Sequence, residues 1–298
     1  MGALVECVAN FSEGRQQTVI DSIVGTIDSA NGVIVLGAES DPDHNRAVVT
    51  FVGPPDRVSD AAYAGIQRAG ELIDLERHRG QHPRIGAADV IPFVPLREVG
   101  MAETVALARK LGKRVGETLN LPVFLYEQAA LQEGNRNLAD IRRGGYERLK
   151  GRIAVGEPPI PDFGPGRLSS AGGCVIGARN LLIAFNVFLD SPDVAIARAI
   201  ARAIRQSSGG LPHVKALGLF VKGRAQVSMN LTNYKMTSMR CVVEAIRNEA
   251  RRLGVKMAAS EIIGLLPQDA LSEVDVAYLQ IENFDQSRVL EHQLADLT

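Results

Sequence analysis

The sequence contains few cysteines, no excess of charge of either sign and no long apolar segment. Cys7, Cys174 and Cys241 are odd in number and far apart, which argues against a disulfide framework and against a zinc site. The 33 Lys and Arg residues against 34 Asp and Glu residues leave a formal net charge of −1. General binding to nucleic acid or to an anionic membrane surface is therefore not expected, because both need surplus cations on one face.

The N-terminal residues MGALVECVAN have none of the features of an exported or lipid-anchored chain. They lack a cationic region followed by a long apolar core, and no apolar run in the chain approaches the ~20 residues that span a bilayer. Glu6 stands where N-myristoylation expects Ser or Thr. Together with the cysteine usage, this predicts a cytoplasmic protein with no membrane and no nucleic-acid partner.

What is present is typical of an α/β (α+β) protein of one or two domains: 298 residues, of which 46% are apolar and 22% charged. Short β-rich runs alternate with stretches of helical periodicity. In the first half this predicts strands at 4–8, 33–38, 46–52 and 89–94, and helices at 16–29 and 56–73. A helix at 102–119 and a strand at 123–126 extend this βαββαβ order.

The second half repeats the same order. Its predicted strands cover 181–189, 216–221, 225–231 and 261–265, and its helices cover 192–205 and 236–253. Right-handed crossovers make a split βαβ sheet with helices on one face the natural product of each half. The stretch VGEPPIPDFGPGRLSSAGG at 155–173 has four prolines and several glycines, so it is either a domain boundary or an ordered crossing loop.

The most reactive candidate lies in RHRGQHPRIG at 77–86. Pro83 holds the backbone of His82 extended, so the imidazole is presented from a turn and could act as a general acid or base. The competing interpretation is a histidine that only hydrogen-bonds within its turn. His78 has the i, i+4 spacing of a helical metal pair with His82, but Gly80 and Pro83 break the helix that such a pair needs, so no metal is expected.

Three other polar stretches have a structural and a functional interpretation each. ESDPDHNR at 39–46 is either a solvated hairpin loop or a binding loop, and it lacks the glycine and distal glutamate of a calcium loop. In NFSEGR, Ser12 is expected to cap the following helix, whose free N–H groups would favour an anion. In RAQVSMNLTN, polar and apolar residues alternate, which predicts one polar strand face. The chain has no P-loop motif.

Eight stretches in chain order resemble the signatures of one family, glutamate formimidoyltransferase, also called glutamate formiminotransferase. The stretches span residues 4–265 and are LVECVANFSEGR, NRAVVTFVGPP, HRGQHPRIGAADVIPFVPLR, PVFLYEQAA, IRRGGYE, PDFGP, GARNLLIAFNVFL and AQVSMNLTNY. The resemblance implies two ferredoxin-like subdomains, which we assign to residues 1–178 and 179–298, with a folate cleft between them. It also implies a homodimer, with a cyclodeaminase, if there is one, as a separate protein.

The activity that the resemblance implies is transfer of a formimino group from N-formimino-L-glutamate to N5 of tetrahydrofolate, a co-substrate, without a metal. His82 would take the proton from N5 and return it to the departing nitrogen. Gly80 and Gly86 would let the backbone approach the pterin, and arginines would meet substrate carboxylates. The residues expected to bind folate or the donor are Asn10, Glu39, Arg46, Arg84, Asp162, Phe163, Gly164, Pro165, Arg179, Asn186 and Asn230.

Two other functions stay open at this point. One is a sister folate activity on the same scaffold, either formyl transfer from N-formylglutamate or ATP-dependent cycloligation of 5-formyltetrahydrofolate. The missing P-loop speaks only weakly against the ATP-dependent activity. The other is a non-catalytic folate-binding or regulatory module in which His82 is structural, and an intact acid or base residue at that position speaks against it.

Overall fold

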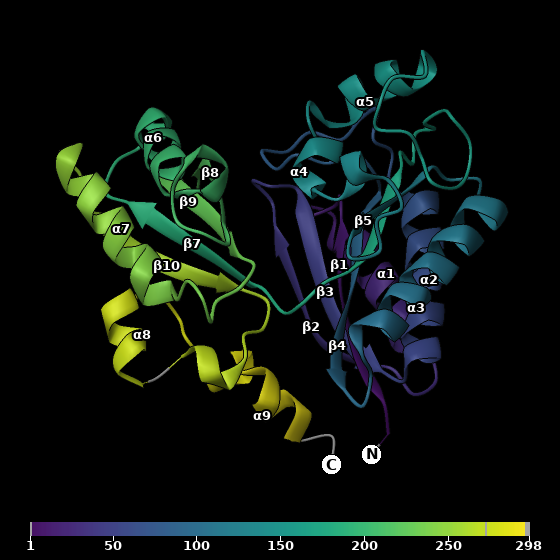
Figure 1. Ribbon diagram of the computed structural model, residues 1–298, viewed down its shortest axis with the longest axis horizontal. Coiled ribbons are helices and arrows are strands. Elements are labelled where there is room, and N and C mark those ends of the chain that lie inside the picture. The colour runs from purple at the N-terminus through teal and green to yellow at the C-terminus, as the bar shows by residue number, and fades with distance from the viewer. Residues whose placement is uncertain (1, 272, 296–298) are drawn as a thin grey trace. The chain divides into compact units, whose positions relative to one another are not determined.

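The computed structural model describes residues 2–271 and 273–295, and the chain divides into two compact units, Met1–Arg179 and Asn180–Thr298 (Figure 1). Each unit has its own sheet and its own apolar core. None of the helices within the described residues is both long and apolar enough to cross a membrane.

The first unit confirms the predicted βαββαβ order. Its elements are β1 Leu4–Phe11, α1 Gln17–Asp28, β2 Ile34–Asp41, β3 Arg46–Gly53, α2 Pro55–Leu72 and β4 Ala88–Arg97. The strands lie in the order β2-β3-β1-β4, and each neighbouring pair is antiparallel. This is the ferredoxin-like arrangement, in which each helix crosses over between two parallel strands separated by a third.

The sheet of this unit continues beyond β4 through an extension that the sequence patterns revealed only in part. The predicted helix and strand are present as α3 Met101–Thr118 and β5 Val123–Glu127. A further strand, β6 Cys174–Ala178, inserts between β4 and β5 and runs parallel to both. Two unpredicted helices, α4 Leu138–Ile141 and α5 Gly145–Ala154, precede it.

The proline- and glycine-rich stretch 155–173 belongs to the first unit, because β6 follows it and joins the first sheet. The stretch is tied down by backbone hydrogen bonds: the N–H of Asp162 donates to Val123 O at 2.8 Å, and the N–H of Gly173 donates to Ile85 O at 3.0 Å. Of the two interpretations of this stretch, the ordered loop is therefore correct and the domain boundary is wrong.

The second unit repeats the same topology. Its elements are β7 Ile183–Leu189, α6 Val194–Ile204, β8 Val214–Val221, β9 Arg224–Leu231, α7 Met239–Arg252 and β10 Met257–Ile263. The strand order β10-β7-β9-β8 matches β4-β1-β3-β2 of the first unit, element for element. Two short helices that the periodicity did not predict, α8 Glu273–Leu279 and α9 Leu290–Ala295, follow β10.

In the first unit, helices α1, α2 and α3 lie along one side of the sheet (Figure 1). Strand β1 shows how the residues divide between the two sides. Val5, Cys7 and Phe11 belong to the apolar core beneath the helices. Successive side chains of a strand point to opposite faces, so Glu6 and Asn10 lie on the face opposite α1, α2 and α3. Polar chemistry on β1 is therefore confined to one face of the sheet.

Gly86 tests how tightly this framework is packed. A Cβ at this position would overlap the carbonyl oxygen of Gly173 in the neighbouring loop, and neither backbone can yield. Gly86→Ala should lower the free energy of unfolding by at least about 2 kcal/mol, measured by denaturant titration. The control is Gly151→Ala in α5, where a Cβ meets nothing and the better helix former should add about 0.5–1 kcal/mol. Equal effects of the two substitutions would contradict this account.

Candidate active site

Three loops of the first unit meet beside the C-terminal end of β1 and the start of β3. They cover residues 12–16, 42–45 and 77–87. Two glycines permit the meeting: a Cβ on Gly14 would clash with the backbone of Asp41 and Arg46, and a Cβ on Gly80 would clash with the carbonyl of His44. The close approach that Gly80 and Gly86 allow is therefore to the protein's own backbone, and the expectation that they serve the pterin has no support in these contacts.

The turn between β2 and β3 is built by two side chains. Asp41 Oδ1 accepts hydrogen bonds from the N–H groups of Asp43 and His44, which is the geometry of an Asx turn. Asn45 has a positive φ of 49°, its Oδ1 accepts from the N–H of Gly14 at 2.9 Å, and its Nδ2 donates to Arg79 O at 3.0 Å. This single side chain therefore joins all three loops just before Arg46.

Arg46 and His82 contact each other directly. Nη1 of Arg46 lies 2.9 Å from Nε2 of His82, and Nδ1 of His82 lies 2.8 Å from Pro83 O. A guanidinium can only donate and a carbonyl can only accept. His82 must therefore be the neutral tautomer that carries its proton on Nδ1 and offers the Nε2 lone pair to Arg46. This is the protonation state of a general base whose basic atom is Nε2.

The surroundings keep His82 neutral. Burial lowers its pKa well below the ordinary value of 6.5, and the positive charges of Arg46 and Arg142 act in the same direction. His44 contributes as well, with its ring stacked on that of His82 at a centroid separation of 5.7 Å. The backbone carbonyl of Pro83 opposes the shift more weakly. Burial also lowers the pKa of Arg46 to about 10, which leaves this arginine charged at neutral pH.

The open face of the sheet brings two further candidates to this cluster. Asn10 accepts a hydrogen bond from Nη2 of Arg46 through its Oδ1. Val48 on β3 pairs with Asn10 on one side and with Glu39 on the other, so Asn10 and Glu39 share one row across three strands. Asn10, Glu39, Arg46 and His82 thus lie on or beside one end of the same sheet face.

The charge balance of this region suits an anionic ligand. Arg46 points a buried Nε–H that has no hydrogen-bond partner among residues 2–271 and 273–295. Arg142, which is close enough to depress the pKa of both Arg46 and His82, pairs with the buried carboxylate of Asp89. Asp89 also accepts from the N–H of Ile85 at 2.8 Å. A buried cation with an unused donor is a good partner for a carboxylate.

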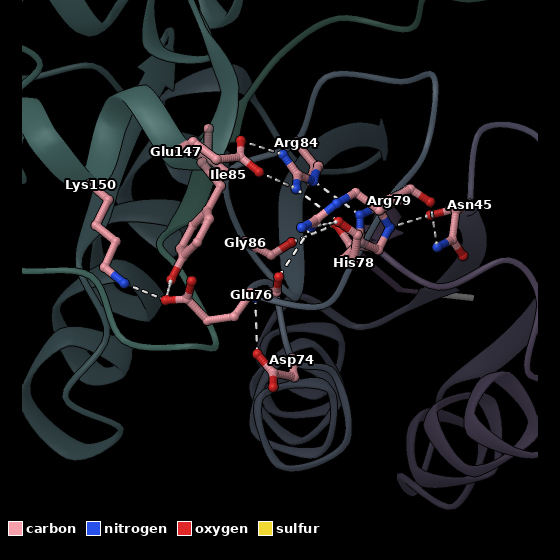
Figure 2. Close-up of polar contacts among 12 residues, drawn as sticks. Asn45, Asp74, Glu76, His78, Arg79, Arg84, Ile85, Gly86, Glu147 and Lys150 are labelled. Carbon is pink, nitrogen blue, oxygen red and sulfur yellow. Dashed lines mark hydrogen bonds and ion pairs between the residues drawn. The ribbon is translucent and has the colours of Figure 1, made fainter.

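Arg84 is engaged elsewhere, as Figure 2 shows. Its Nη1 and Nη2 bind the two carboxylate oxygens of Glu147 at 2.9 and 2.8 Å, and its Nε donates to Nδ1 of His78 at 3.0 Å. The ion pair lowers the pKa of Glu147 to about 2. His78 in turn donates from Nε2 to Asn45 O at 2.8 Å, so both of its ring nitrogens are used. These contacts fix Arg84 and His78 behind the loop of His82.

The predicted helix cap at Ser12 is wrong. Ser12 Oγ donates to Gly86 O at 2.6 Å, and α1 begins only at Gln17. The free N–H groups before the helix belong to Gly14, Arg15 and Gln16, and all three donate to Oε1 of Glu13 at 2.8–3.0 Å. The anion expected at this position is thus an internal carboxylate, which outcompetes a hydroxyl because it is charged.

The PDFGP stretch, residues 161–165, lies along β5, at the opposite edge of the sheet from β2. Asp162 Oδ2 accepts from the N–H of Leu125 at 2.7 Å, and Phe163 packs against the apolar core. Gly164 has a φ of +81° and lies so close to Leu121 that no Cβ would fit. Pro165 is half-buried. These contacts anchor the stretch against β5 and the apolar core.

The remaining candidates are two asparagines of the second unit and Arg179, the last residue of the first unit. Asn186 on β7 donates from Nδ2 to Glu261 Oε1 at 3.0 Å. Asn230 on β9 is exposed and pairs across the sheet with Ala184. Arg179 follows β6 directly, and its N–H donates to Phe93 O at 3.0 Å.

Sequence patterns missed four residues near these candidates. Asp89 and Glu6 are carboxylates in otherwise apolar strands. Burying a charge is costly, so a carboxylate in such a strand could have marked both residues as candidates. Tyr126 is the penultimate residue of β5, and burial raises its pKa to about 12. Arg142 directly follows the short helix α4, and nothing in its spacing marks it.

Comparison with known proteins gives two family matches that together span nearly the whole chain. Residues 4–179 match the Formiminotransferase domain, N-terminal subdomain, and residues 184–297 match the Formiminotransferase domain. A protein named glutamate formimidoyltransferase from Thermoplasma acidophilum is 49% identical over 98% of this chain and 97% of its own length. One of the same name from Streptococcus pyogenes is 42% identical over 99% of both chains. A formimidoyltransferase-cyclodeaminase from Rattus norvegicus is 41% identical over 95% of this chain, which covers 53% of that protein.

The contact between Arg46 and His82 predicts a measurable pKa. Protonation of His82 would break the hydrogen bond from Arg46 and place two cations together, so the pKa should lie below 6.5 in the unmodified protein. In Arg46→Met it should rise toward 6.5, because one opposing charge is gone. NMR titration of the imidazole resonances measures both values. Arg114→Met, which alters an ion pair on the helical side, is the control and should leave the pKa unchanged. An unchanged pKa in Arg46→Met would contradict the assigned contact.

Proposed function

Because the chain belongs to the formiminotransferase family, we propose that it transfers the formimino group of N-formimino-L-glutamate to N5 of tetrahydrofolate, giving 5-formiminotetrahydrofolate and L-glutamate. The observation that carries the proposal is the neutral His82 with its Nε2 lone pair held by Arg46. Tetrahydrofolate enters as a co-substrate. The transfer moves a group between two nitrogens without a change in oxidation state, so it needs no redox cofactor.

His82 supplies the proton transfers. N5 attacks the amidine carbon, and a tetrahedral intermediate forms that joins both nitrogens to this carbon. Nε2 of His82 takes the proton from N5, and the imidazolium then gives it to the nitrogen of glutamate, so that the bond between carbon and this nitrogen breaks. The bond from Nδ1 to Pro83 O holds the ring in the tautomer that can begin this sequence.

Arg46 supplies the link between binding and chemistry. In the structure it occupies Nε2 of His82, which must be vacated before the base can act. A carboxylate of formiminoglutamate offers Arg46 a charge-assisted partner that is stronger than a neutral imidazole. Substrate binding would therefore draw the guanidinium away and free the base. Arg142, whose charge already acts on Arg46, would add positive potential for the second carboxylate of the donor.

The role of His82 predicts a large loss of rate with little loss of binding. In His82→Asn, the kcat should fall by about 10²–10⁴ under single-turnover conditions, while the dissociation constant of tetrahydrofolate stays within a few-fold. The purified protein is assayed with tetrahydrofolate and formiminoglutamate. His292→Asn on α9 is the matched control and should keep its rate. Near-normal turnover by His82→Asn would refute the assigned role.

The position of Glu39 predicts that this residue selects between the two possible group donors. Formiminoglutamate carries a cationic amidinium where N-formylglutamate carries a neutral oxygen, and Glu39 lies in the row of Asn10. A charge-assisted hydrogen bond is worth about 1.5–3 kcal/mol, so Glu39→Gln should lower kcat/KM for formiminoglutamate about ten- to a hundredfold. Any use of N-formylglutamate should be nearly unaffected. Equal losses for both donors would show that Glu39 has a structural role and that donor choice lies elsewhere.

A further inference from the structure

Glu6 is a buried carboxylate that the reaction described above does not use. Its side chain lies in the middle of the first sheet and only 2% of the residue is exposed. Oε2 is buried and has no hydrogen-bond partner among the residues that the structure describes. Buried carboxylates are normally paired, because an unpaired one costs several kcal/mol in lost hydration. A carboxylate held in this way is suited to a ligand that brings its own donors.

The position of Glu6 relates it to the reacting residues. Glu6 pairs with Val52 on β3 and Val94 on β4, and it lies on the same face of β1 as Asn10. Four residues of strand separate the two backbones by roughly 13 Å. Val8 stands between them on this face and is partly exposed. Along β1 this face thus presents the carboxylate of Glu6, then the apolar Val8, and then the cluster of Asn10, Arg46 and His82.

The charges around Glu6 leave it ready to ionise. Burial raises its pKa to about 7, and the nearby Arg179 opposes this shift. Arg179 stands two strands away, just beyond β6, where its N–H binds Phe93 O. Its guanidinium also acts on Tyr126 and lowers the pKa of that phenol against the effect of burial. Two added N–H donors would shift Glu6 fully to the carboxylate at neutral pH.

We propose that Glu6 binds the pterin ring of tetrahydrofolate, with its two carboxylate oxygens accepting from N3–H and from the 2-amino group. That edge of the pterin presents two parallel N–H donors, which match the two oxygens of one carboxylate. N5 belongs to the second ring, on the side away from this edge. A pterin held at Glu6 and lying over Val8 therefore directs N5 toward His82. The assignment rests on the proposed function and identifies the residue that orients its co-substrate.

The test compares the unmodified protein and Glu6→Gln, each with two ligands. Dissociation constants are measured for tetrahydrofolate and for its analogue with the 2-amino group replaced by hydrogen. The unmodified protein should bind the analogue about ten- to a hundredfold more weakly, the usual cost of one hydrogen bond to a charged group. In Glu6→Gln the two ligands should differ by less than about threefold, because the amide cannot accept from both donors.

Two controls separate the possible failures. Glu117→Gln on the exposed side of α3 should discriminate between the ligands as the unmodified protein does. If Glu6→Gln is not folded by circular dichroism, Glu6→Asp, which keeps the charge, is used and should weaken binding of tetrahydrofolate more than of the analogue. Retained discrimination in Glu6→Gln, or none in the unmodified protein, would overturn the role of Glu6. Failure of the unmodified protein to bind tetrahydrofolate at all would instead overturn the proposed function.

Discussion

The hydrogen bond from the Arg46 guanidinium to Nε2 of His82 is the contact on which the site depends. Together with the bond to Pro83 it selects one tautomer of the imidazole, it adds to burial in keeping the ring neutral, and it holds a buried cation beside the ring. Each of these effects requires the loops around 42–45 and 77–87 to stay in register. Gly14, Gly80 and Asn45 provide this register through close backbone packing and three-way hydrogen bonding. The loop contacts of Asn45 and the two glycines are formed before the reaction begins, and preorganised contacts of this kind lower the barrier.

The sheet gives this cluster a rigid support. Because β1 alternates between faces, its apolar residues secure the helices while Glu6 and Asn10 reach the other side. Residues brought by β1, β2 and β3 stand in one row at Asn10 and Glu39. The second unit repeats the topology with other polar residues on the corresponding strands, among them Asn186 and Asn230. A duplicated scaffold can thus carry different chemistry in each copy, since function lies in the side chains and not in the fold.

Sequence patterns predicted the part of the fold that depends on local periodicity. The two βαββαβ orders follow from strands with apolar alternation and from helices with one apolar face, and both are confirmed. Strand β6 was not predicted because its five residues, CVIGA, are too few to show a periodicity and follow a stretch rich in glycine and proline. Its place between β4 and β5 depends on long-range parallel pairing, which no local pattern contains. The boundary interpretation of 155–173 failed for the same reason.

The residues of the site could likewise be predicted only where local sequence determines them. His82 was identifiable because the proline after it sets its backbone and its imidazole titrates near neutral pH. The contact between His82 and Arg46 could not be predicted from the sequence, because the two residues are 36 positions apart and meet only through the packing of two loops. The capping motif predicted Ser12 as the acceptor for the free N–H groups. The carboxylate of Glu13 accepts from them instead, and Ser12 donates to Gly86 O.

The proposed role of His82 requires an imidazole that is neutral at physiological pH, and the pH dependence of kcat/KM for formiminoglutamate tests this most directly. A base must be unprotonated in the free enzyme, so activity is lost as the pH falls through its pKa. With the pKa of His82 depressed, the acidic limb of the profile should lie below pH 6.5. An acidic limb at or above pH 6.5, or the same limb surviving in His82→Asn, would contradict the account.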